Sequence, residues 1–445
     1  MRDSWQAMII DGLAALERQQ QRARNTLTLI PSENSMSPLA RIPLITDAAH
    51  RYFFADPDST DWSFPAGRHA AVVETELTIP VMRELTGASY VTVRPLSGLH
   101  AMTLTLAGLA GPPGSPVVTV DPNQGGHYAT ADLARRLGLL PLPASGPDPH
   151  SLDLDALTTL VAEHQPPLVY LDQSHSLFPF NTAAVATAIH AAGTTTRLHV
   201  DVSHWLGLIG GGALPNPLDQ GADSIGGSTH KTFPGPQKGF IATNDAAIAG
   251  LITAMQPTLI SNHHLAAVCS LGLAVAEFLT CDGSGYAHAV VTAAGVLGHA
   301  LHQRGLRPEA ADRGITASHQ LWVRTTPVGV AATTAAARLE AAGIAVNVLP
   351  DLPGIGEPAL RLGVAEAIYQ GLTVRDMYQL ADLMVCAVLD PAATGNIAAQ
   401  VAVLRQARTS PYQLPCEHFV TATLERILSG SVAGDIPDVQ MAAWP

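Results

Sequence analysis

One lysine, Lys231, lies among small and hydroxyl residues, where its amine could do chemistry. It follows a short stretch typical of a strand, residues 224–226, and precedes a turn rich in Gly and Pro, residues 233–236. A lysine at a strand end, in a partly desolvated pocket, has a lowered pKa and can form a Schiff base with a carbonyl. Taken by itself, this segment fits a solvated lysine in a loop better than a lysine that forms a Schiff base.

A carboxylate at the end of another apolar run makes a Schiff-base role for Lys231 the better interpretation. Asp201 lies in the run 197–202, upstream of Lys231. An aspartate at a strand end suits the pyridine nitrogen of pyridoxal 5′-phosphate (PLP), because that nitrogen must stay protonated for the ring to accept electrons. A helix-capping aspartate is the alternative. The lysine and the aspartate together favour a PLP site.

Two turns could complete such a site. Ser97 and Gly98 stand at an expected helix start, where a hydroxyl and free backbone N–H groups can bind an anion such as the cofactor phosphate. In Gly125-Gly126-His127, the glycines allow close backbone approach, and the histidine could lie flat on the cofactor ring. Taken alone, a plain N-cap and a turn before a surface histidine explain these segments equally well.

The elements that must position these residues alternate along the chain. Short apolar runs typical of strands occur at residues 90–93, 116–120, 168–172, 197–202, 224–226 and 239–243. Ala-rich segments typical of helices occur at residues 99–110, 129–137, 183–192 and 265–279. This alternation predicts a mainly parallel α/β sheet, whose ligands bind beyond the carboxyl ends of the strands. We expect an N-terminal arm over 1–45, a large cofactor-binding domain over 46–283 and a small α+β domain over 284–445.

The composition argues against several classes of partner. The net charge is −13 and no cluster of Lys or Arg stands out, so nucleic acid and anionic membrane are not expected as partners. The four cysteines form no C-x-x-C pair, which suggests neither a metal site nor disulfides and predicts a reducing cytoplasm. We find no signal peptide and no run approaching the roughly 20 apolar residues of a membrane span.

Taken together, these segments resemble serine hydroxymethyltransferase and its relatives over most of the chain. The most specific matches are Thr229-His230-Lys231-Thr232 and Asp201-Val202-Ser203-His204. Leu29-Ile30-Pro31-Ser32-Glu33-Asn34 and Ala359-Leu360-Arg361-Leu362-Gly363 match two further family segments. The resemblance implies an aspartate-aminotransferase-like fold (PLP fold type I), PLP as cofactor, and a homodimer, or a dimer of dimers, with active sites at the subunit interface.

The resemblance also implies a role for each matching residue. Lys231 would bond to the cofactor, Asp201 would pair with its nitrogen, and His127 would stack on its ring. Arg361 and Ser32 would bind the carboxylate of the amino acid, for which a planar guanidinium offers two hydrogen bonds. The other expected site residues are Ser97 and Gly98 at the phosphate, Ser174 at the cofactor hydroxyl, and His204 and His230 at the flanks.

The chain departs from the family pattern where the family handles substrate protons and folate. A family motif with a catalytic Glu corresponds to the stretch from Tyr52, and two alignments are open. One equates Tyr52 with the motif's Tyr and puts Phe54 in place of the Glu; the other, slightly preferred, puts Asp56 there. The partner's glycine-rich phosphate loop is replaced by residues 260–263, which include Asn262. These changes weaken the case for tetrahydrofolate.

A chain intact around the cofactor but altered on the folate side is expected to perform aldol and retro-aldol chemistry. The substrate would be a small amino acid of the Ser, Thr or Gly type, and the acceptor an aldehyde or a one-carbon carrier, as in threonine transaldolases of specialised metabolism. Asp56, His127 or His204 could be the general base. The alternatives are a folate-dependent glycine hydroxymethyltransferase, a racemase, aminotransferase or decarboxylase on the same fold, and a non-catalytic binding protein.

Overall fold

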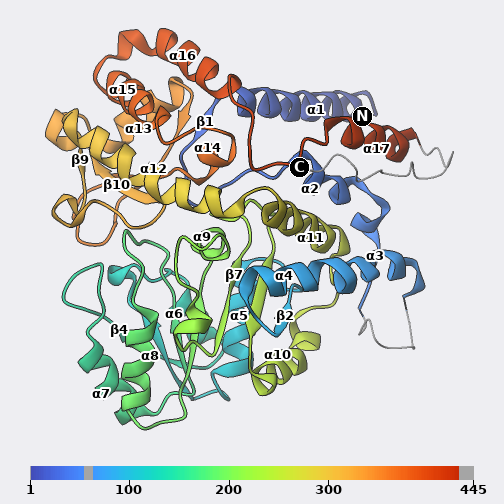
Figure 1. The fold of residues 1–445 in the computed structure, drawn as a ribbon, viewed down its shortest axis with the longest axis vertical. Helices are drawn as coiled ribbons and strands as arrows, with labels where there is room; N and C mark the ends of the chain where they lie inside the picture. The colour runs from blue at the N-terminus through green and yellow to red at the C-terminus, as the bar shows by residue number, and fades with distance from the viewer. Residues whose placement is uncertain (1, 55–63, 430–445) are drawn as a thin grey trace.

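The computed structural model describes residues 2–54 and 64–429, which form two main sheets with helices around them (Figure 1). The larger sheet has seven strands in the order β2-β8-β7-β6-β5-β3-β4. Neighbouring strands from β7 to β4 in this order are parallel, whereas β8 is antiparallel to both β2 and β7. The strands are β2 (Tyr90–Thr92), β3 (Pro116–Val120), β4 (Leu140–Ala144), β5 (Leu168–Leu171), β6 (Arg197–Asp201), β7 (Ser224–Ser228) and β8 (Gly239–Thr243).

This sheet confirms the predicted mainly parallel α/β architecture. Each of the six predicted strands is present, with bounds that differ by at most a few residues. Strand β4 was missed because Pro141 and Pro143 in it are typical of a loop; it lies at the sheet edge, where proline is tolerated. Alternate residues of the central strands, such as Tyr170 and Leu171, belong to two separate apolar clusters. Both faces of the sheet are therefore covered, as in other parallel sheets.

The loops at the carboxyl ends of the strands lead into helices that pack on the sheet. Helix α5 (Gly98–Leu109) packs on β7 and β8, and α6 (Thr130–Arg136) packs on β3 and β4. The short helix α9 (Leu206–Gly210) follows β6 after a tight turn. Helices α7 (Leu154–His164), α8 (Thr182–Ala191) and α10 (Ala246–Leu259) complete this part of the chain. Since the parallel strands end at one edge, the polar residues after β5, β6 and β7 are brought together.

The second sheet is antiparallel, with the order β12-β13-β10-β9. Its strands are β9 (Arg307–Pro308), β10 (Gln320–Arg324), β12 (Asn347–Leu349) and β13 (Ala359–Gly363). The helices of this part of the chain are α12 (Gly283–Gln303), α13 (Ala332–Ala341), α14 (Ala365–Tyr369), α15 (Asp376–Leu389) and α16 (Thr394–Gln406). The last described helix, α17 (Glu417–Ser429), packs instead on α2 (Pro38–Arg41). Helix α12 runs along the junction of the two sheets and packs on α9, α14 and α15 (Figure 1). A chain division near residue 283 stays a prediction.

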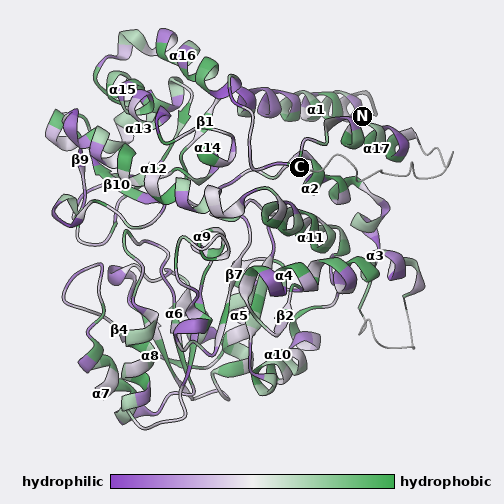
Figure 2. Cartoon of the chain, viewed as in Figure 1, coloured by the Kyte–Doolittle hydropathy of each residue, from purple (hydrophilic) through white to green (hydrophobic). Residues whose placement is uncertain are grey.

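The N-terminal segment is tied to the later part of the chain through a separate two-stranded sheet. Helix α1 (Arg2–Asn25) leads into β1 (Leu27–Thr28), which pairs in parallel with β11 (Ile344–Ala345). Figure 2 shows α11 (Leu265–Thr280) hydrophobic over most of its length, in keeping with its buried position, whereas the second half of α1 is hydrophilic. Within residues 2–54 and 64–429, no single helix has the length and apolarity of a membrane span.

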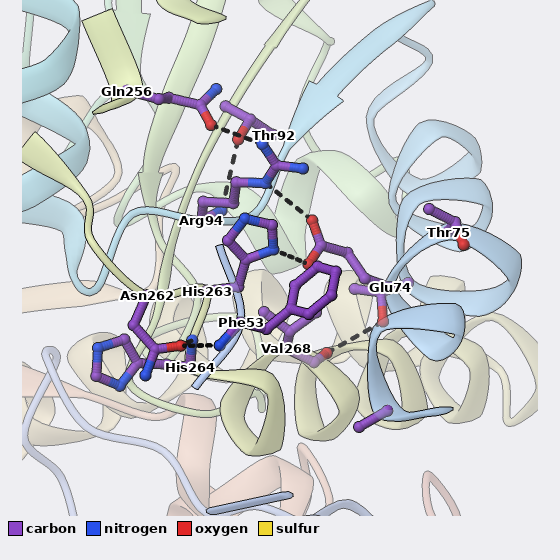
Figure 3. A network of polar contacts seen from close by, with 12 residues as sticks. Phe53, Glu74, Thr75, Thr92, Arg94, Gln256, Asn262, His263, His264 and Val268 are labelled. Carbon is purple, nitrogen blue, oxygen red and sulfur yellow. Dashed lines mark hydrogen bonds and ion pairs between the residues drawn. The ribbon is translucent and has the colours of Figure 1, made fainter. Parts of the chain in front are cut away.

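A buried network of charged side chains holds the loop that precedes α11 (Figure 3). Glu74 lies in a π-helical turn (Glu74–Thr78), is 1% exposed, and accepts a hydrogen bond from Arg94 Nε at 3.1 Å. Its other oxygen lies 2.9 Å from His263 Nδ1. Lys238 Nζ donates to the backbone carbonyls of Arg94 and His263, at 3.3 and 3.1 Å. Burial raises the pKa of Glu74, but the His263 hydrogen bond and the charges of His263 and Arg94 outweigh burial and keep it below its usual value.

Replacing Glu74 with glutamine is expected to lower the free energy of unfolding by about 3 kcal/mol, because it leaves buried cations without a counter-charge. Thermal melting of the Glu74→Gln protein measures this loss. Glu76→Gln, an exposed carboxylate in the same turn, is the matched control and should cost less than about 0.5 kcal/mol. Equal melting temperatures for both variants would show that the network does not stabilise the fold.

Candidate active site

A cavity of about 200 Å³ opens at the carboxyl ends of β5, β6 and β7. Besides sequence-predicted site residues, Leu99, Met102, Asp172, Gln173, Ser203 and Ser228 line it. The structure thus brings together segments that are far apart in the sequence. The predicted site residues among those lining it are Ser97, Gly98, His127, Ser174, Asp201, His204, His230 and Lys231.

Asp201 is held firmly at the end of β6 and is only 8% exposed. Its Oδ1 accepts a hydrogen bond from the backbone N–H of Ser203, and its Oδ2 accepts one from the hydroxyl of Tyr170, each at 2.8 Å. Tyr170 is buried in β5 and stacks on His199, with ring centroids 4.9 Å apart. The carboxylate therefore has a fixed orientation toward the cavity.

Lys231 follows β7 after two residues and presents its amine to the same cavity. Burial lowers the pKa of Lys231 to about 8, although the charge of Asp201 acts in the opposite direction. At pH 7, roughly a tenth of this lysine is then the neutral amine, against fewer than about one in a thousand for an ordinary lysine. The backbone is fixed here, because Asn34 Nδ2 donates to the carbonyl of Lys231 at 2.8 Å. The site therefore holds an amine ready to attack a carbonyl.

The start of α5 forms a small cradle on one side of the cavity. Ser97 Oγ caps the helix by accepting a hydrogen bond from the N–H of His100 at 3.1 Å. A Cβ added at Gly98 would lie 2.9 Å from Cβ of Ser228, so a side chain there would close the cradle. Within the described part of the chain, the buried Oγ of Ser228 has no hydrogen-bond partner. An unpaired hydroxyl beside the start of a twelve-residue helix suits a phosphate.

The turn before α6 depends on its glycines. Gly125 has φ +88°, and a Cβ there would lie 2.1 Å from the carbonyl oxygen of His175. This turn brings the ring of His127 to the cavity, where desolvation lowers the pKa of that histidine. The backbone N–H of His127 donates to Oδ2 of Asp172 at 3.2 Å. Only a residue without a side chain allows so close an approach.

Asp172 adds a second carboxyl to the cavity. It is 2% exposed, and its Oδ2 also accepts a hydrogen bond from the hydroxyl of Thr130. Its Oδ1 has no partner among the described residues. Burial raises the pKa of Asp172 to about 8, so this carboxyl is mostly neutral at pH 7. The cavity therefore contains two carboxyl groups in different surroundings, Asp172 and Asp201.

Arg361 reaches the cavity walls from the second sheet. It lies within β13, is 5% exposed, and donates from Nη2 to the carbonyl of Ser174 at 2.7 Å. The same nitrogen lies 3.3 Å from Nε2 of His204, and Nε donates to Oε1 of Gln320 at 3.0 Å. Gln320 also donates to the carbonyl of Ser174, at 3.1 Å. These contacts join the two sheets, while burial lowers the pKa of Arg361 to about 9.

Three expected site residues of the described chain, besides Arg361, do not line this cavity. Ser32 lines a second, larger cavity that also touches His230. Tyr52 is 46% exposed and packs on the ring of Phe64, with centroids 4.7 Å apart. Asn262 Oδ1 accepts hydrogen bonds from the N–H groups of Phe53 and His264, both at 3.2 Å (Figure 3). Asp56 lies outside the described residues. Neither Tyr52 nor Asn262 lines the cavity of its own chain.

Sequence reasoning missed three polar residues that shape the site: Tyr170, Asp172 and Gln320. Tyr170 and Asp172 belong to a segment read as a continuous apolar strand, and every residue of β5 is buried, so no alternation marks them. Gln320 is the first residue of β10 in the second sheet, far in sequence from the site. A polar residue inside a strand that is otherwise apolar was the available signal, because buried polar groups are normally hydrogen-bonded.

Comparisons with known proteins agree with this arrangement. The family model for serine hydroxymethyltransferase matches residues 10–384. An L-threonine:uridine-5′-aldehyde transaldolase of a Streptomyces species is 45% identical over 368 residues, covering 82% of this chain and 87% of the relative. The serine hydroxymethyltransferase of Methanopyrus kandleri is 34% identical over 401 residues, covering 88% and 92%. The solved L-threonine transaldolase of Pseudomonas fluorescens, in its internal aldimine state, has a TM-score of 0.83 at 27% identity, covering 96% and 99%.

These relatives confirm the predicted PLP fold type I, and the residues present fit the cofactor. The desolvated amine of Lys231 and the fixed carboxylate of Asp201 line one cavity. The cradle at Gly98 and the unpaired hydroxyl of Ser228 suit the phosphate. With the family model matching most of the chain, this protein belongs to the serine hydroxymethyltransferase family and is a PLP-dependent enzyme.

Proposed function

We propose that this protein is a transaldolase, which cleaves the Cα–Cβ bond of a β-hydroxy amino acid such as L-threonine and joins the glycine unit to another aldehyde. The observation that carries the proposal is the complete set formed by Lys231, Asp201 and Arg361, combined with the missing Glu of the family's proton-handling motif. Relatives named as threonine transaldolases support it, and three of them are named for uridine-5′-aldehyde. A nucleoside-type aldehyde is therefore one candidate acceptor.

The residues of the cavity would divide the work. When bound, PLP supplies an electron sink for the electron pair that remains at Cα. Lys231 would hold the cofactor by its aldehyde, and Asp201 would keep the pyridine nitrogen protonated. Ser97, Gly98 and Ser174 would orient the phosphate and the ring hydroxyl. Arg361 would bind the amino-acid carboxylate, because it is buried and already oriented by Ser174 and His204.

Neutral histidines are suited to take the proton of the substrate hydroxyl. Burial lowers the pKa of His230 to about 4, and its buried Nδ1 has no partner among the described residues. The pKa of His204 is also lowered, by burial and by the nearby cations. Both rings are therefore proton acceptors at neutral pH. His230 touches both cavities, so we add it to His127, His204 and Asp56 as a candidate base.

An aldehyde-exchange assay tests the proposed function. L-Threonine and a set of acceptor aldehydes are incubated with the PLP-loaded enzyme, and acetaldehyde and the new β-hydroxy amino acid are measured. We expect both products to appear in equal amounts and without tetrahydrofolate. The protein would instead be a glycine hydroxymethyltransferase if it converts glycine to serine only with methylene-tetrahydrofolate and releases no acetaldehyde from threonine.

Gln320 is expected to be a positioning residue for Arg361. Gln320→Leu keeps the side-chain size but removes the hydrogen bond to Nε, so the KM for L-threonine should rise about tenfold while kcat changes less. Steady-state release of acetaldehyde measures both constants. Gln303→Leu, at the exposed end of α12, is the matched control and should leave them unchanged. An unchanged KM in Gln320→Leu would show that Arg361 needs no support from this amide.

The first half of α1 supports a homodimer. Exposed apolar side chains recur on it at helical spacing; they are Trp5, Met8, Ile9, Ile10, Leu13 and Leu16, each 58–68% exposed. A second copy of the chain would bury them, as apolar stripes on helices normally require. Sedimentation of the wild-type protein and of Ile9→Glu would test this assembly. The four cysteines are free thiols, which is consistent with the proposed cytoplasmic location.

A further inference from the structure

A second cavity, of about 910 Å³, lies between α1, α14, α16 and the segment 32–38. It adjoins the cofactor cavity, because His230 lines both. Asn34 also lines it and donates to the backbone carbonyl of Lys231. We call this space the acceptor chamber. A molecule in it would lie next to the reacting centre without occupying the space that the cofactor needs.

The acceptor chamber has an excess of positive charge. Four arginines line it: Arg24, Arg41, Arg405 and Arg408. Arg408 pairs with Asp376, but within the described part of the chain the other three form no ion pair. The Nε atoms of Arg405 and Arg408 are buried and have no partner among the described residues. A buried N–H group without an acceptor is costly, so an anion that accepts a hydrogen bond from one of these Nε atoms would be stabilised.

The carboxylates of the chamber offset only part of this charge. Glu33 is exposed, and Glu366 accepts a hydrogen bond from Gln370 Nε2 at 2.7 Å. Burial, followed by the charge of Glu33, raises the pKa of Glu366 to about 7, against the opposing effect of Arg405. Glu366 therefore carries about half a negative charge at neutral pH. In a protein with a net charge of −13, this local excess of arginine is an exception.

Side-chain amides and hydroxyls make up much of the remaining wall. The amides are those of Gln19, Gln20, Gln237, Gln370 and Gln413. Ser32, Ser35 and Ser410 add hydroxyls. Amides offer both donors and acceptors, which matches the hydroxyl groups of a polyol chain and gives an apolar chain little to contact.

We propose that the acceptor chamber binds the aldehyde acceptor, and that this acceptor carries hydroxyl groups and an anionic group, a phosphate or a carboxylate, held by Arg405. The inference rests on the proposed function. In the reaction, the Cα–Cβ bond of threonine breaks, its hydroxyl proton passes to a base, and acetaldehyde leaves. A new bond then forms between Cα and the carbonyl carbon of the acceptor, whose oxygen takes the proton. Atoms and electrons balance without an oxidant or a reductant.

Matched acceptors test this charge preference. With saturating L-threonine, acetaldehyde release is compared for D-glyceraldehyde 3-phosphate and D-glyceraldehyde, and for succinic semialdehyde and butanal. We expect kcat/KM to be at least about tenfold higher for the anionic member of one pair or both, and the better pair identifies phosphate or carboxylate. Equal values within both pairs would overturn the charge preference.

Variants of Arg405 link the preference to the chamber. Arg405→Gln should lower kcat/KM for the favoured anionic aldehyde about tenfold and leave the value for its neutral twin nearly unchanged, while Arg405→Lys should restore part of the loss. Arg135→Gln, a surface arginine on α6, is the matched control and should change neither value. The same loss for neutral and anionic aldehydes in Arg405→Gln would count against a direct contact with the anion.

Binding without turnover separates this inference from the proposed function. Calorimetry on the PLP-loaded protein should detect glycerol 3-phosphate or succinate more strongly than glycerol, and Arg405→Gln should weaken that binding. If threonine releases no acetaldehyde with any aldehyde, the proposed function fails, whereas anion binding that depends on Arg405 would still support the site. If exchange occurs but anion binding is absent or indifferent to Arg405, only the present inference fails.

Discussion

Replacing Lys231 with alanine should abolish the visible absorbance of the PLP-loaded enzyme and lower amino-acid cleavage on the order of 10⁴-fold or more. The reason is that Lys231 provides the one amine that lines the described cofactor cavity. Without it, PLP can be held only by hydrogen bonds and ion pairs. Absorbance spectra after reconstitution and dialysis, together with acetaldehyde release from threonine, measure the two effects.

The sequence offers an unusually direct control for this result, because the chain contains only two lysines, Lys231 and Lys238. Both are desolvated, and burial lowers the pKa of each to about 8. Lys238 Nζ, however, donates to two backbone carbonyls in the Glu74 network and does not line the cavity. Borohydride reduction should therefore attach PLP to Lys231 alone, and Lys238→Arg should keep the label. A label on Lys238 would refute the assignment.

The pH dependence of reconstitution follows from the same pKa. The attacking form is the neutral amine, and burial lowers the pKa of Lys231 to about 8. The rate at which the apo-protein binds PLP covalently should therefore rise about tenfold per unit of pH up to about 8 and then level off. Stopped-flow absorbance measures this rate. A rise that continues to about pH 10 would indicate that the lysine is not desolvated before the cofactor binds.

The site residues that can be predicted directly from the sequence are those at the ends of strands. Lys231 was found because it follows one apolar run and Asp201 because it ends another, and parallel strands end at the same edge. Arg361 could be assigned only through a family segment, because a single arginine inside a buried strand has no periodic signal. β4 could not be predicted, because its two prolines are typical of loops.

The remaining contacts depend on packing that one sequence does not reveal. Tyr170 reaches Asp201 across neighbouring strands, and Gln320 reaches Arg361 across two strands of the other sheet. Such pairings are set by register, which is fixed by the burial of both sheet faces. Neither Tyr52 nor Asn262 lines the cavity of its own chain, so the contacts of one chain do not test the roles expected for them. Their roles stay predictions.

The second large effect is expected from Asp201→Asn. Asparagine can still accept from the N–H of Ser203 and can donate to the oxygen of Tyr170, so the fold should be unchanged in thermal melting. The negative charge is lost, however, and the cofactor nitrogen would no longer be kept protonated. Cleavage of L-threonine should fall on the order of a thousandfold, which corresponds to about 4 kcal/mol in the activation barrier, while Lys231 still binds PLP.

Asp172→Asn is the matched control, because it removes a carboxyl from the same cavity. Burial raises the pKa of Asp172 to about 8, so this side chain is mostly neutral at pH 7. An amide has the same shape, and its oxygen can still accept from the N–H of His127 and the hydroxyl of Thr130. The loss of activity should then be no more than about threefold at pH 7. If the order were reversed, with Asp172→Asn the more damaging change, the charge that acts on the cofactor would belong to Asp172 rather than to Asp201. The ring would then have to lie in a different orientation from the one that Lys231 and Asp201 imply.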